Sequence, residues 1–406
     1  MTPFRYLPNL VWVPTVWLGL LHGGQARAED GLQLSASVAQ TQDSNLFRTD
    51  GAMVKTPTGL SSAAERIGTT TFGLGFHKAY SLQRVELDVS LVDYQYQNFD
   101  YLSFTAKNYT AAWRWSFTPR LRGNLTSSRK EALNSFSDYA TNTLINQRNQ
   151  RTDTNNGFDA IYELSGPWRL LAGMSQQKQV NQQALLTDSD FSANAAQLGA
   201  RYEFASGSNL AYTFKASSGS YINRALSATN LYDDGYQQTD SDLRLRWLAS
   251  GKVTANFNIG YVQRTHPNFS RRNYSGVNTG VNINWNLTGK TTLSAEWSRR
   301  LASYQTNDAN YSQTDSLSVG PSWQISTKTF VGLRHEVAQV DYLGEPFGTV
   351  ATPRQDTNRS TTLSLVWQPR QQATLSASLA NTARSSSLPG NDYSSRQATL
   401  SANYSF

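Results

Sequence analysis

Apolar and polar side chains alternate with a period of two along most of this 406-residue chain. In the last segment, 398–406, the even-numbered residues are Ala, Leu, Ala, Tyr and Phe, and those between them are Thr, Ser, Asn and Ser. A period of two is that of a β-strand with one apolar and one polar face. Similar alternation occurs in segments 85–91, 210–214, 253–261 and 373–379.

Short turns and longer polar stretches alternate along the chain, as in a membrane barrel that has short turns on one side and long loops on the other. Closure in lipid requires that no strand edge stays unpaired. We therefore expect an all-β, transmembrane antiparallel β-barrel of about eighteen strands, with sixteen left open, and both termini on the side of the short turns. The short turns are expected near residues 79–81, 118–120, 166–167, 206–208, 250–252, 288–290, 326–328 and 369–371, and the most conspicuous longer stretches are 43–65, 131–152, 221–235 and 343–357.

The first residues have the pattern of a secretory signal peptide. Arg5 supplies the positive charge, residues 10–21 form a short apolar run, and Ala26-Arg27-Ala28 is a small-x-small cleavage site. Twelve apolar residues are too few for a membrane-spanning helix, which needs about twenty. The predicted organisation is a signal peptide at 1–28 and an outer-membrane β-barrel at 29–406.

The composition agrees with strands that have one lipid-facing side. Charged residues make up 16% of the chain, against roughly 25% in soluble domains, and aromatic residues 12%. The absence of cysteine excludes disulfides and cysteine-based metal or redox sites. Seven aromatic residues precede a short turn or the C-terminus, where they are expected to form one interfacial girdle: Trp115, Phe204, Trp247, Trp285, Trp323, Trp367 and Phe406.

The polar face of the strands is expected to line the lumen. Charges that face lipid at mid-depth cost roughly 2–4 kcal/mol for Arg or Lys, so these are assigned inward: Arg84, Glu86, Asp88, Arg114, Arg120, Arg122, Asp159, Glu163, Arg201, Glu203, Lys215, Asp242, Arg244, Arg246, Glu296, Arg300, Arg334 and Glu336. Two interpretations stay open. Neighbouring Arg and Glu pair across strands and stabilise the wall, or a weakly positive lumen attracts anionic or hydroxyl-rich solutes. The basic candidates are Arg120, Arg122, Arg244 and Arg246 first, with Arg114 and Arg201.

Known catalytic and metal-binding motifs are missing from the sequence, so an enzyme is not expected. The mature chain has three histidines, none beside a nucleophile motif. His335 falls on the lipid-facing register, and a phospholipase-like pairing of His335 with Ser364 is disfavoured. Paired acids at Asp188/Asp190 and Asp233/Asp234 are expected to be solvated rather than to bind Ca²⁺. No basic cluster with interleaved aromatics indicates nucleic acid, and no metal or cofactor is expected.

The exit of the first strand carries Asp43, Asn45, Phe47 and Arg48 in an acid-x-Asn-Leu-Phe-Arg element. This element, with the overall layout, resembles the EpsL-type outer-membrane proteins associated with exopolysaccharide biosynthesis, within the porin-2-like barrels. The resemblance implies a role in exopolysaccharide export and no catalytic residues. Asn45 is expected to adopt the unusual backbone of a turn, and Asp43 to pair with Arg48. The element either shapes the first loop or gates the pore.

The function expected from sequence is a channel-like conduit for exopolysaccharide, with Tyr94 and Tyr96 able to stack on sugar rings. Periplasmic export proteins would deliver the polymer. The terminal Phe406 resembles the signal that the barrel-assembly machinery recognises, and outer-membrane lipid is the expected surrounding. The alternatives are a diffusion porin for small anionic or sugar solutes, and a plugged barrel with a structural role. Loops 43–65 and 131–152 are long enough to fold inward.

Overall fold

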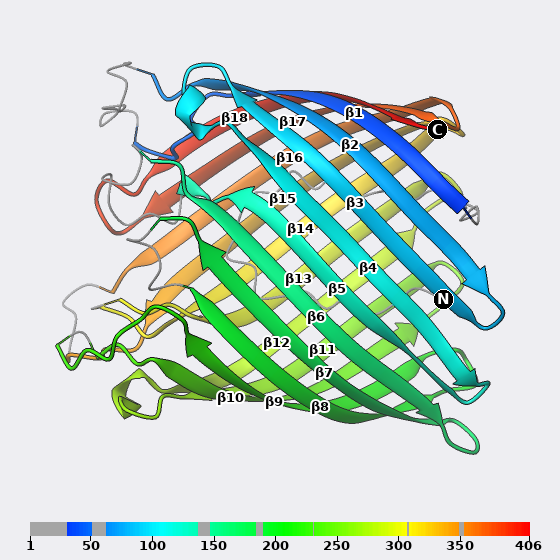
Figure 1. Cartoon of the computed structure of the whole chain (residues 1–406), viewed down its shortest axis with the longest axis horizontal. Coiled ribbons are helices and arrows are strands. Elements are labelled where there is room, and N and C mark those ends of the chain that lie inside the picture. The colour runs from blue at the N-terminus through cyan, green and yellow to red at the C-terminus, as the bar shows by residue number, and fades with distance from the viewer. Residues whose placement is uncertain are drawn as a thin grey trace.

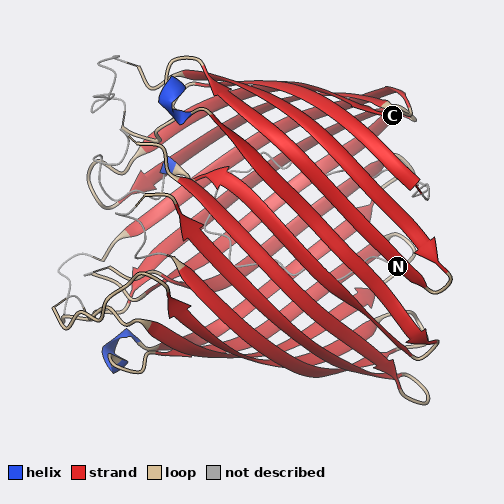
Figure 2. Ribbon diagram, viewed as in Figure 1, coloured by secondary structure: helices blue, strands red, loops and turns tan. Residues whose placement is uncertain are grey.

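The computed structural model is a closed antiparallel barrel of 18 strands (Figures 1 and 2). It describes residues 31–50, 62–136, 147–183, 190–229, 231–306, 308–348 and 353–406. Every strand pairs with its neighbours in sequence, and β1 (Gly31–Asp43) closes the barrel by pairing with β18 (Tyr393–Ser405). The predicted eighteen-stranded barrel is confirmed. The predicted signal peptide, residues 1–28, lies outside the described residues.

The remaining strands run from 13 to 16 residues each. They are β2 (Glu65–Tyr80), β3 (Gln83–Tyr96), β4 (Phe104–Thr118), β5 (Leu121–Leu133), β6 (Gln150–Glu163), β7 (Trp168–Asn181), β8 (Phe191–Glu203), β9 (Asn209–Tyr221), β10 (Gly235–Leu248), β11 (Val253–Thr265), β12 (Tyr274–Asn286), β13 (Thr291–Ser303), β14 (Tyr311–Ser326), β15 (Thr329–Leu343), β16 (Gln355–Arg370) and β17 (Ala373–Ser386). All of them are longer than the roughly 9–11 residues that span a bilayer. The barrel therefore has length to spare beyond its membrane-crossing part.

Each expected short turn joins two strands at one end of the barrel, and the longer connections lie at the other end (Figure 1). Gly31 pairs with His77 close to the β2/β3 turn, and Phe406 follows directly on β18. Both ends of the described chain therefore lie at the short-turn end, as expected. No helix in the described part is long and apolar enough to cross a membrane.

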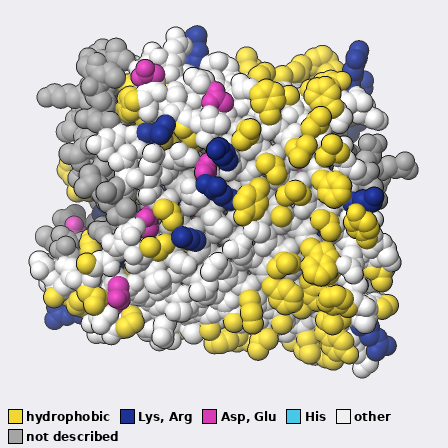
Figure 3. Space-filling view, viewed as in Figure 1, with side chains coloured by type: hydrophobic (Ala, Val, Ile, Leu, Met, Phe, Trp, Pro, Cys, Tyr) yellow, Lys and Arg dark blue, Asp and Glu magenta, His cyan; other side chains and the backbone are white. Residues whose placement is uncertain are grey.

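The outer surface carries an apolar band toward the short-turn end (Figure 3). Acids and several bases lie nearer the long loops, and further bases lie at the short-turn rim. Large apolar side chains such as Phe72, Leu198 and Leu400 point outward and are 63–69% exposed. An apolar exterior on a closed barrel of this size is what a lipid bilayer covers. The chain is therefore a membrane-spanning β-barrel.

Most of the aromatic girdle is exposed near the short turns, as expected, but Trp115 is packed against the wall. Its side chain is only 4% exposed, lies against Gly123 and stacks on Phe158 with ring centroids 5.7 Å apart. A Cβ at Gly123 would come within 2.5 Å of the Trp115 ring. The glycine thus makes room for the indole on the outer surface.

Two parts of the barrel repeat the same local frame at the long-loop end. After β3, the segment Asn98–Phe99 enters a 3-10 turn at Asp100–Leu102, and after β11 the segment Asn268–Phe269 enters one at Ser270–Arg272. A buried acid accepts the loop amides in each case. The acids are Glu65 at the start of β2 and Asp233 just before β10.

Candidate functional site: the barrel lumen

The lumen is lined by the polar residues of every strand, as the alternation predicts. Strand register fixes their direction, because directly opposed residues share a face. Leu125 lies opposite Phe158 on the outer face, so the adjacent pair, Asn124 and Asp159, faces the lumen. Every predicted lumen charge that lies within a strand follows this rule.

One ion-pair group lies on β3 and β4. Arg84 and Arg114 lie directly opposite each other, and both contact the carboxylate of Glu86 between them. Arg114 makes two bonds to it, at 2.9 and 2.8 Å, and a third bond to Asn124. At Arg114, therefore, the wall-stabilising interpretation is the one that the contacts support.

A second group joins β5, β6 and β7. Arg122 donates to Glu163 at 2.5 Å, and Arg169 approaches the same carboxylate at 3.5 Å. Arg169 follows the Gly166-Pro167 turn and was not among the sequence candidates. Arg120 lies in the β4/β5 turn, where it is exposed and makes no ion pair with any described residue. It belongs to the rim rather than to the lumen wall.

Arginines from β7, β8 and β10 gather on one side of the lumen. Arg169 lies opposite Arg201, Arg201 lies opposite Ala211, and Ala211 lies opposite Arg244. Ala211 lies between Arg201 and Arg244 and is only 3% exposed. Its short side chain does not extend into the space between the two guanidinium groups. Arg246 follows two residues after Arg244 on the same face and is exposed, without an ion pair in the described part of the chain. We call Arg169, Arg201, Arg244 and Arg246 the arginine wall.

Carboxylates near the arginine wall are fewer than its bases. Arg201 pairs with Glu203 at 2.7 Å, and Arg244 with Asp242 at 3.3 Å. Glu163 is shared between Arg169 and Arg122. This side of the lumen therefore keeps a positive excess, although the predicted candidates Arg122, Arg201 and Arg244 each have an acidic partner. Sequence alone showed Arg201, Arg244 and Arg246, but neither Arg169 nor the small number of acids near them.

The first-loop element anchors the chain at the long-loop end. Arg48 binds the Asp43 carboxylate with two nitrogens, at 3.0 and 2.9 Å, and Asp43 also accepts bonds from Ser395 and Gln397 on β18. Asp43 is 1% exposed. The predicted Asp43–Arg48 pairing is confirmed. The unusual turn backbone predicted at Asn45 is wrong, because the left-handed conformation falls on Arg48, with φ 54°. The side-chain amide of Asn45 instead donates to the backbone carbonyls of Thr49 and Ser394.

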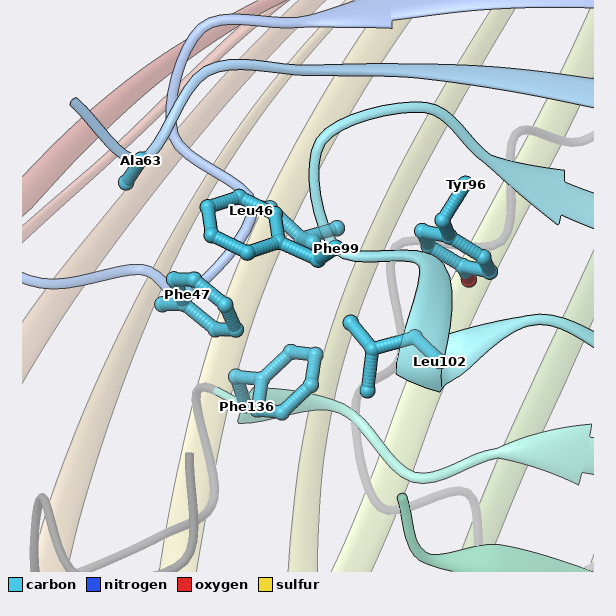
Figure 4. Close-up of a cluster of buried hydrophobic side chains, with 7 residues drawn as sticks. All are labelled: Leu46, Phe47, Ala63, Tyr96, Phe99, Leu102 and Phe136. Atoms are coloured by element: carbon cyan, nitrogen blue, oxygen red, sulfur yellow. The ribbon is translucent and has the colours of Figure 1, made fainter. Parts of the chain in front are cut away.

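An apolar cluster, which we call the apolar loop cluster, forms where the connections after β1, β3 and β5 meet (Figure 4). Phe47 packs edge-on against Phe99 and Phe136, with centroid distances of 4.7 and 4.9 Å. The described parts of the two loops expected to fold inward, at Phe47 and Phe136, thus meet each other. Its members are Leu46, Phe47, Ala63, Tyr96, Phe99, Leu102 and Phe136.

The tyrosines expected to stack on sugar rings are used inside the protein. Tyr94 stacks on Phe104 with centroids 4.8 Å apart, and Tyr96 is 9% exposed within the apolar loop cluster. Their ring faces are therefore not available to a polymer in the lumen.

A second cluster, which we call the arginine–tyrosine cluster, lies at the same end near β9–β12. The guanidinium of Arg264 lies 3.7 Å from the ring centroid of Tyr236, and that of Arg224 lies 3.7 Å from that of Tyr221. Arg272 is fully buried and donates to the carbonyls of Leu231, Thr306 and Ala309. Sequence reasoning missed this cluster because its members come from four separate connections and strands.

His266, just after β11, lies inside the arginine–tyrosine cluster and is 4% exposed. Burial, together with the positive charge of Arg264, lowers the pKa of His266 to about 4. The side chain of Gln305 lies 2.8 Å from the Nε2 atom of His266 and accepts a bond from Arg224 through its carbonyl oxygen. The amide of Gln305 therefore donates to Nε2, and His266 is neutral at physiological pH.

The contacts of the remaining histidine and acid candidates are structural. His335 faces outward and bonds to Thr361, whereas Ser364 faces the lumen and donates to the carbonyl of Gly332, so the two cannot form a catalytic pair. The expectation that the paired acids are solvated is wrong for Asp190 and Asp233, which are buried. Asp190 accepts bonds from Asn181 and Asn223, and Asp233 accepts bonds from loop amides. Asp188 lies outside the described residues. Within the described ranges, no group of three or more His, Asp or Glu is placed to hold a metal ion.

Comparison with known proteins shows the fold. No family model and no curated protein matches the chain. Among solved structures it is similar to OpdK of Pseudomonas aeruginosa with vanillate (TM-score 0.53, 13% identity, 92% of this chain and 99% of that one). It is also similar to OccK2 (OpdF) of Pseudomonas aeruginosa in complex with glucuronate (0.51, 12%, 93% and 98%) and to OpdL of Pseudomonas aeruginosa (0.52, 13%, 93% and 99%). At these identities the likeness establishes a shared outer-membrane barrel.

Proposed function

We propose that this protein is an outer-membrane diffusion channel for small solutes that carry a carboxylate, including acidic sugars. The observation that carries the proposal is the arginine wall, which has more guanidinium groups than neighbouring carboxylates. An 18-stranded barrel is wide enough to enclose an aqueous channel. Arginine suits the role because its planar fork binds a carboxylate through two parallel hydrogen bonds.

Two of the similar structures support the choice of solute. OpdK was solved with vanillate and OccK2 with glucuronate, and both compounds are carboxylates, one aromatic and one a sugar acid. These ligands belong to those proteins. They support the proposal because the same barrel architecture in this chain presents bases to its lumen.

The ion pairs of the wall are of a kind that a passing solute can replace. Arg244 and Asp242 are 43% and 26% exposed, and their closest atoms are 3.3 Å apart. Partly exposed pairs of this kind contribute about 0–1 kcal/mol. A solute carboxylate can therefore exchange with Asp242 at Arg244 at little cost and move along the wall from one guanidinium to the next. A field of one sign also raises the local concentration of anions in the lumen.

Exopolysaccharide export, which the EpsL-type resemblance implies, has less support. The three similar structures named above are described with vanillate, with glucuronate or without a ligand, and not with a polysaccharide. The element that carries the resemblance binds β1 to β18 through Asp43, which is a structural role. The tyrosines expected to meet sugar rings are packed in the wall. A deletion strain with unchanged surface polysaccharide is the result we expect.

Single barrels in planar bilayers test the proposal. Glucuronate should interrupt the ionic current at a lower concentration than glucose, which has the same ring without the carboxylate. Replacing Arg169, Arg201 and Arg244 together by Gln should remove most of that difference. Lys178→Gln is the matched control, because Lys178 is exposed on the outer face of β7. Equal interruption by the two sugars in the unmodified protein would overturn the proposal.

A further inference from the structure

The outer face of the barrel has a groove where β16, β17, β18 and β1 lie side by side. Two hollows of about 550 and 560 Å³ share Leu365, Ala377, Leu400 and Gln40, and these four residues are consecutive partners across the four strands. The hollows therefore form one continuous groove. Leu363 on β16 faces outward beside it, so the groove lies on the lipid-facing side.

Small side chains form the floor of this groove and leucines form its sides. Ala377, Ala398 and Ala402 line it from β17 and β18. Leu363, Leu379 and Leu400 border it and are 45–66% exposed. At the short-turn end the lining includes Trp367, a member of the aromatic girdle. A narrow apolar channel of this shape matches an extended hydrocarbon chain.

Basic side chains lie at the other end of the groove. Arg66 on β2 lines it directly. Arg396 lies on the outer face of β18, two residues beyond Ala398, and Arg359 lies on the outer face of β16, opposite Ala383. All three are exposed, and none of their side chains bonds to any residue within the described ranges. The three arginines face outward on the long-loop side of the apolar band. Figure 3, which draws one face of the barrel, shows Lys and Arg side chains on this side of the band.

Acids on the neighbouring outer surface are already engaged. Asp93 on β3 accepts bonds from Gln95 and Thr105. Asp341 on β15 accepts bonds from Gln339 and Gln355. Neither acid forms an ion pair with Arg66, Arg359 or Arg396, so these arginines are available to a partner outside the chain.

From these observations we infer that the groove binds a phosphorylated, acylated lipid of the leaflet at the long-loop end. One acyl chain lies along Ala377 and Ala398, and the headgroup phosphates lie among Arg66, Arg359 and Arg396. In the groove the acyl chain exchanges van der Waals contacts with other lipid tails for contacts with the barrel. Guanidinium–phosphate bonds, which are among the strong, geometrically specific hydrogen bonds, supply the preference for a phosphorylated headgroup. The charge argues against a second copy of the chain as occupant, because a symmetric contact would present the same three arginines from both sides.

Native mass spectrometry of the detergent-purified protein tests this inference. The probes are bisphosphorylated lipid A and the same lipid with its phosphates removed. The unmodified barrel should retain the phosphorylated lipid about tenfold better, as expected for the loss of charge-assisted bonds worth about 1.4 kcal/mol. The triple variant Arg66→Gln, Arg359→Gln and Arg396→Gln should lose that preference.

Two further variants separate the headgroup from the groove. Ala377→Phe fills the floor and should weaken both lipids equally, while Lys178→Gln, an exposed outer base on the far side of the barrel, should change neither. Unaltered electrophoretic migration of the folded barrel shows that each variant is intact. Equal retention of the two lipids by the unmodified protein, or undiminished retention by the triple variant, overturns the inference. A lipid-free dimer that the triple variant disrupts would assign the groove to a second copy and also overturns it.

Discussion

The apolar loop cluster and the arginine–tyrosine cluster are built on the same frame but filled with different side chains. In both, the backbone amide of the residue that precedes the loop donates to the side chain of the residue that ends it. Tyr96 donates to Ser103 in the first cluster, and His266 donates to Asn273 in the second. Leu102 and Arg272 both donate their amides to the carbonyl of the phenylalanine three residues earlier, Phe99 or Phe269. The same buried position is therefore taken by an apolar side chain on one side of the mouth and by a cation on the other.

The correspondence extends into the strands. Asn108 on β4 accepts the amide of Glu131, and Asn278 on β12 accepts the amide of Leu301. Tyr94 stacks on Phe104 beside the apolar loop cluster. At the equivalent positions of the arginine–tyrosine cluster, the guanidinium of Arg264 lies 5.8 Å from the ring centroid of Tyr274. Backbone hydrogen bonds thus define the loops, while the buried side chains decide whether a loop contributes an apolar contact or positive charge. The lumen mouth is consequently asymmetric.

Exchanging the two buried side chains breaks the comparison most strongly. Leu102→Arg places a cation among Phe47, Phe99 and Phe136 without a partner, which should destabilise the barrel by about 3–5 kcal/mol. Arg272→Leu leaves three loop carbonyls without this donor and should cost about 2–3 kcal/mol, which is less than the cost of an unpaired buried charge. Urea unfolding in micelles, followed by tryptophan fluorescence, measures both. A larger loss for Arg272→Leu than for Leu102→Arg would contradict the assignment.

Neutralising the capping acids tests the shared frame itself. Glu65→Gln and Asp233→Asn keep the shape of each side chain but replace a charged acceptor of several amides. Each should cost about 1.5–3 kcal/mol, the range for hydrogen bonds to charged groups. Hydrogen exchange should accelerate at the amides of 97–99 in the first variant and of 268–269 in the second. Faster exchange at both loops in either variant would mean that the frames are not independent.

Acidification should separate the two clusters. The pKa of His266 is lowered from 6.5 to about 4 by burial and by Arg264, so the folded loop favours the neutral imidazole. The contribution of the neutral His266 to the free energy of unfolding is complete above about pH 6.5 and is lost as the pH falls toward 4. Tyr96, at the equivalent position, stays neutral throughout this range.

Hydrogen exchange, corrected for the intrinsic rate, checks this difference. Between pH 7 and 4.5, protection should fall in residues 266–273 and stay constant in 96–103. The variant His266→Gln should remove the pH dependence. Equal loss of protection in both loops would point to a general effect of acid.

The smallest effect is expected at the asparagines that accept an amide from the neighbouring strand. Asn108→Ala and Asn278→Ala each remove one hydrogen bond to the amide of Glu131 or Leu301. Each should lower the free energy of unfolding by about 1 kcal/mol. Urea unfolding measures both, and free energies of unfolding that differ between the two variants by more than this amount would show that the two frames are not equivalent in energy.

Strand number, turn positions and the direction of the strand residues were predictable from sequence, because alternation and turn chemistry are local. The pairing of Asp43 with Arg48 was predictable for the same reason, since only four residues separate them. The sharing of Glu163 by Arg122 and Arg169 was not, because it depends on the register of three strands. The sequence did not predict Arg169 as a lumen residue, because it lies directly after the turn at Gly166.

The arginine–tyrosine cluster shows a second limit. Arg264, Arg272 and His266 look like ordinary polar residues at the end of a strand, and their burial follows from loops that meet only in the folded barrel. The resemblance at Asp43–Arg48 implied a polymer as cargo, which the comparisons with solved structures do not support. The contacts of that element concern barrel closure.

The sign of the reversal potential of single barrels in a KCl gradient tests the central claim most directly. The arginine wall predicts preferential passage of chloride, and a shift toward potassium when Arg169, Arg201 and Arg244 are replaced by Gln. Preferential passage of potassium through the unmodified barrel would contradict the claim.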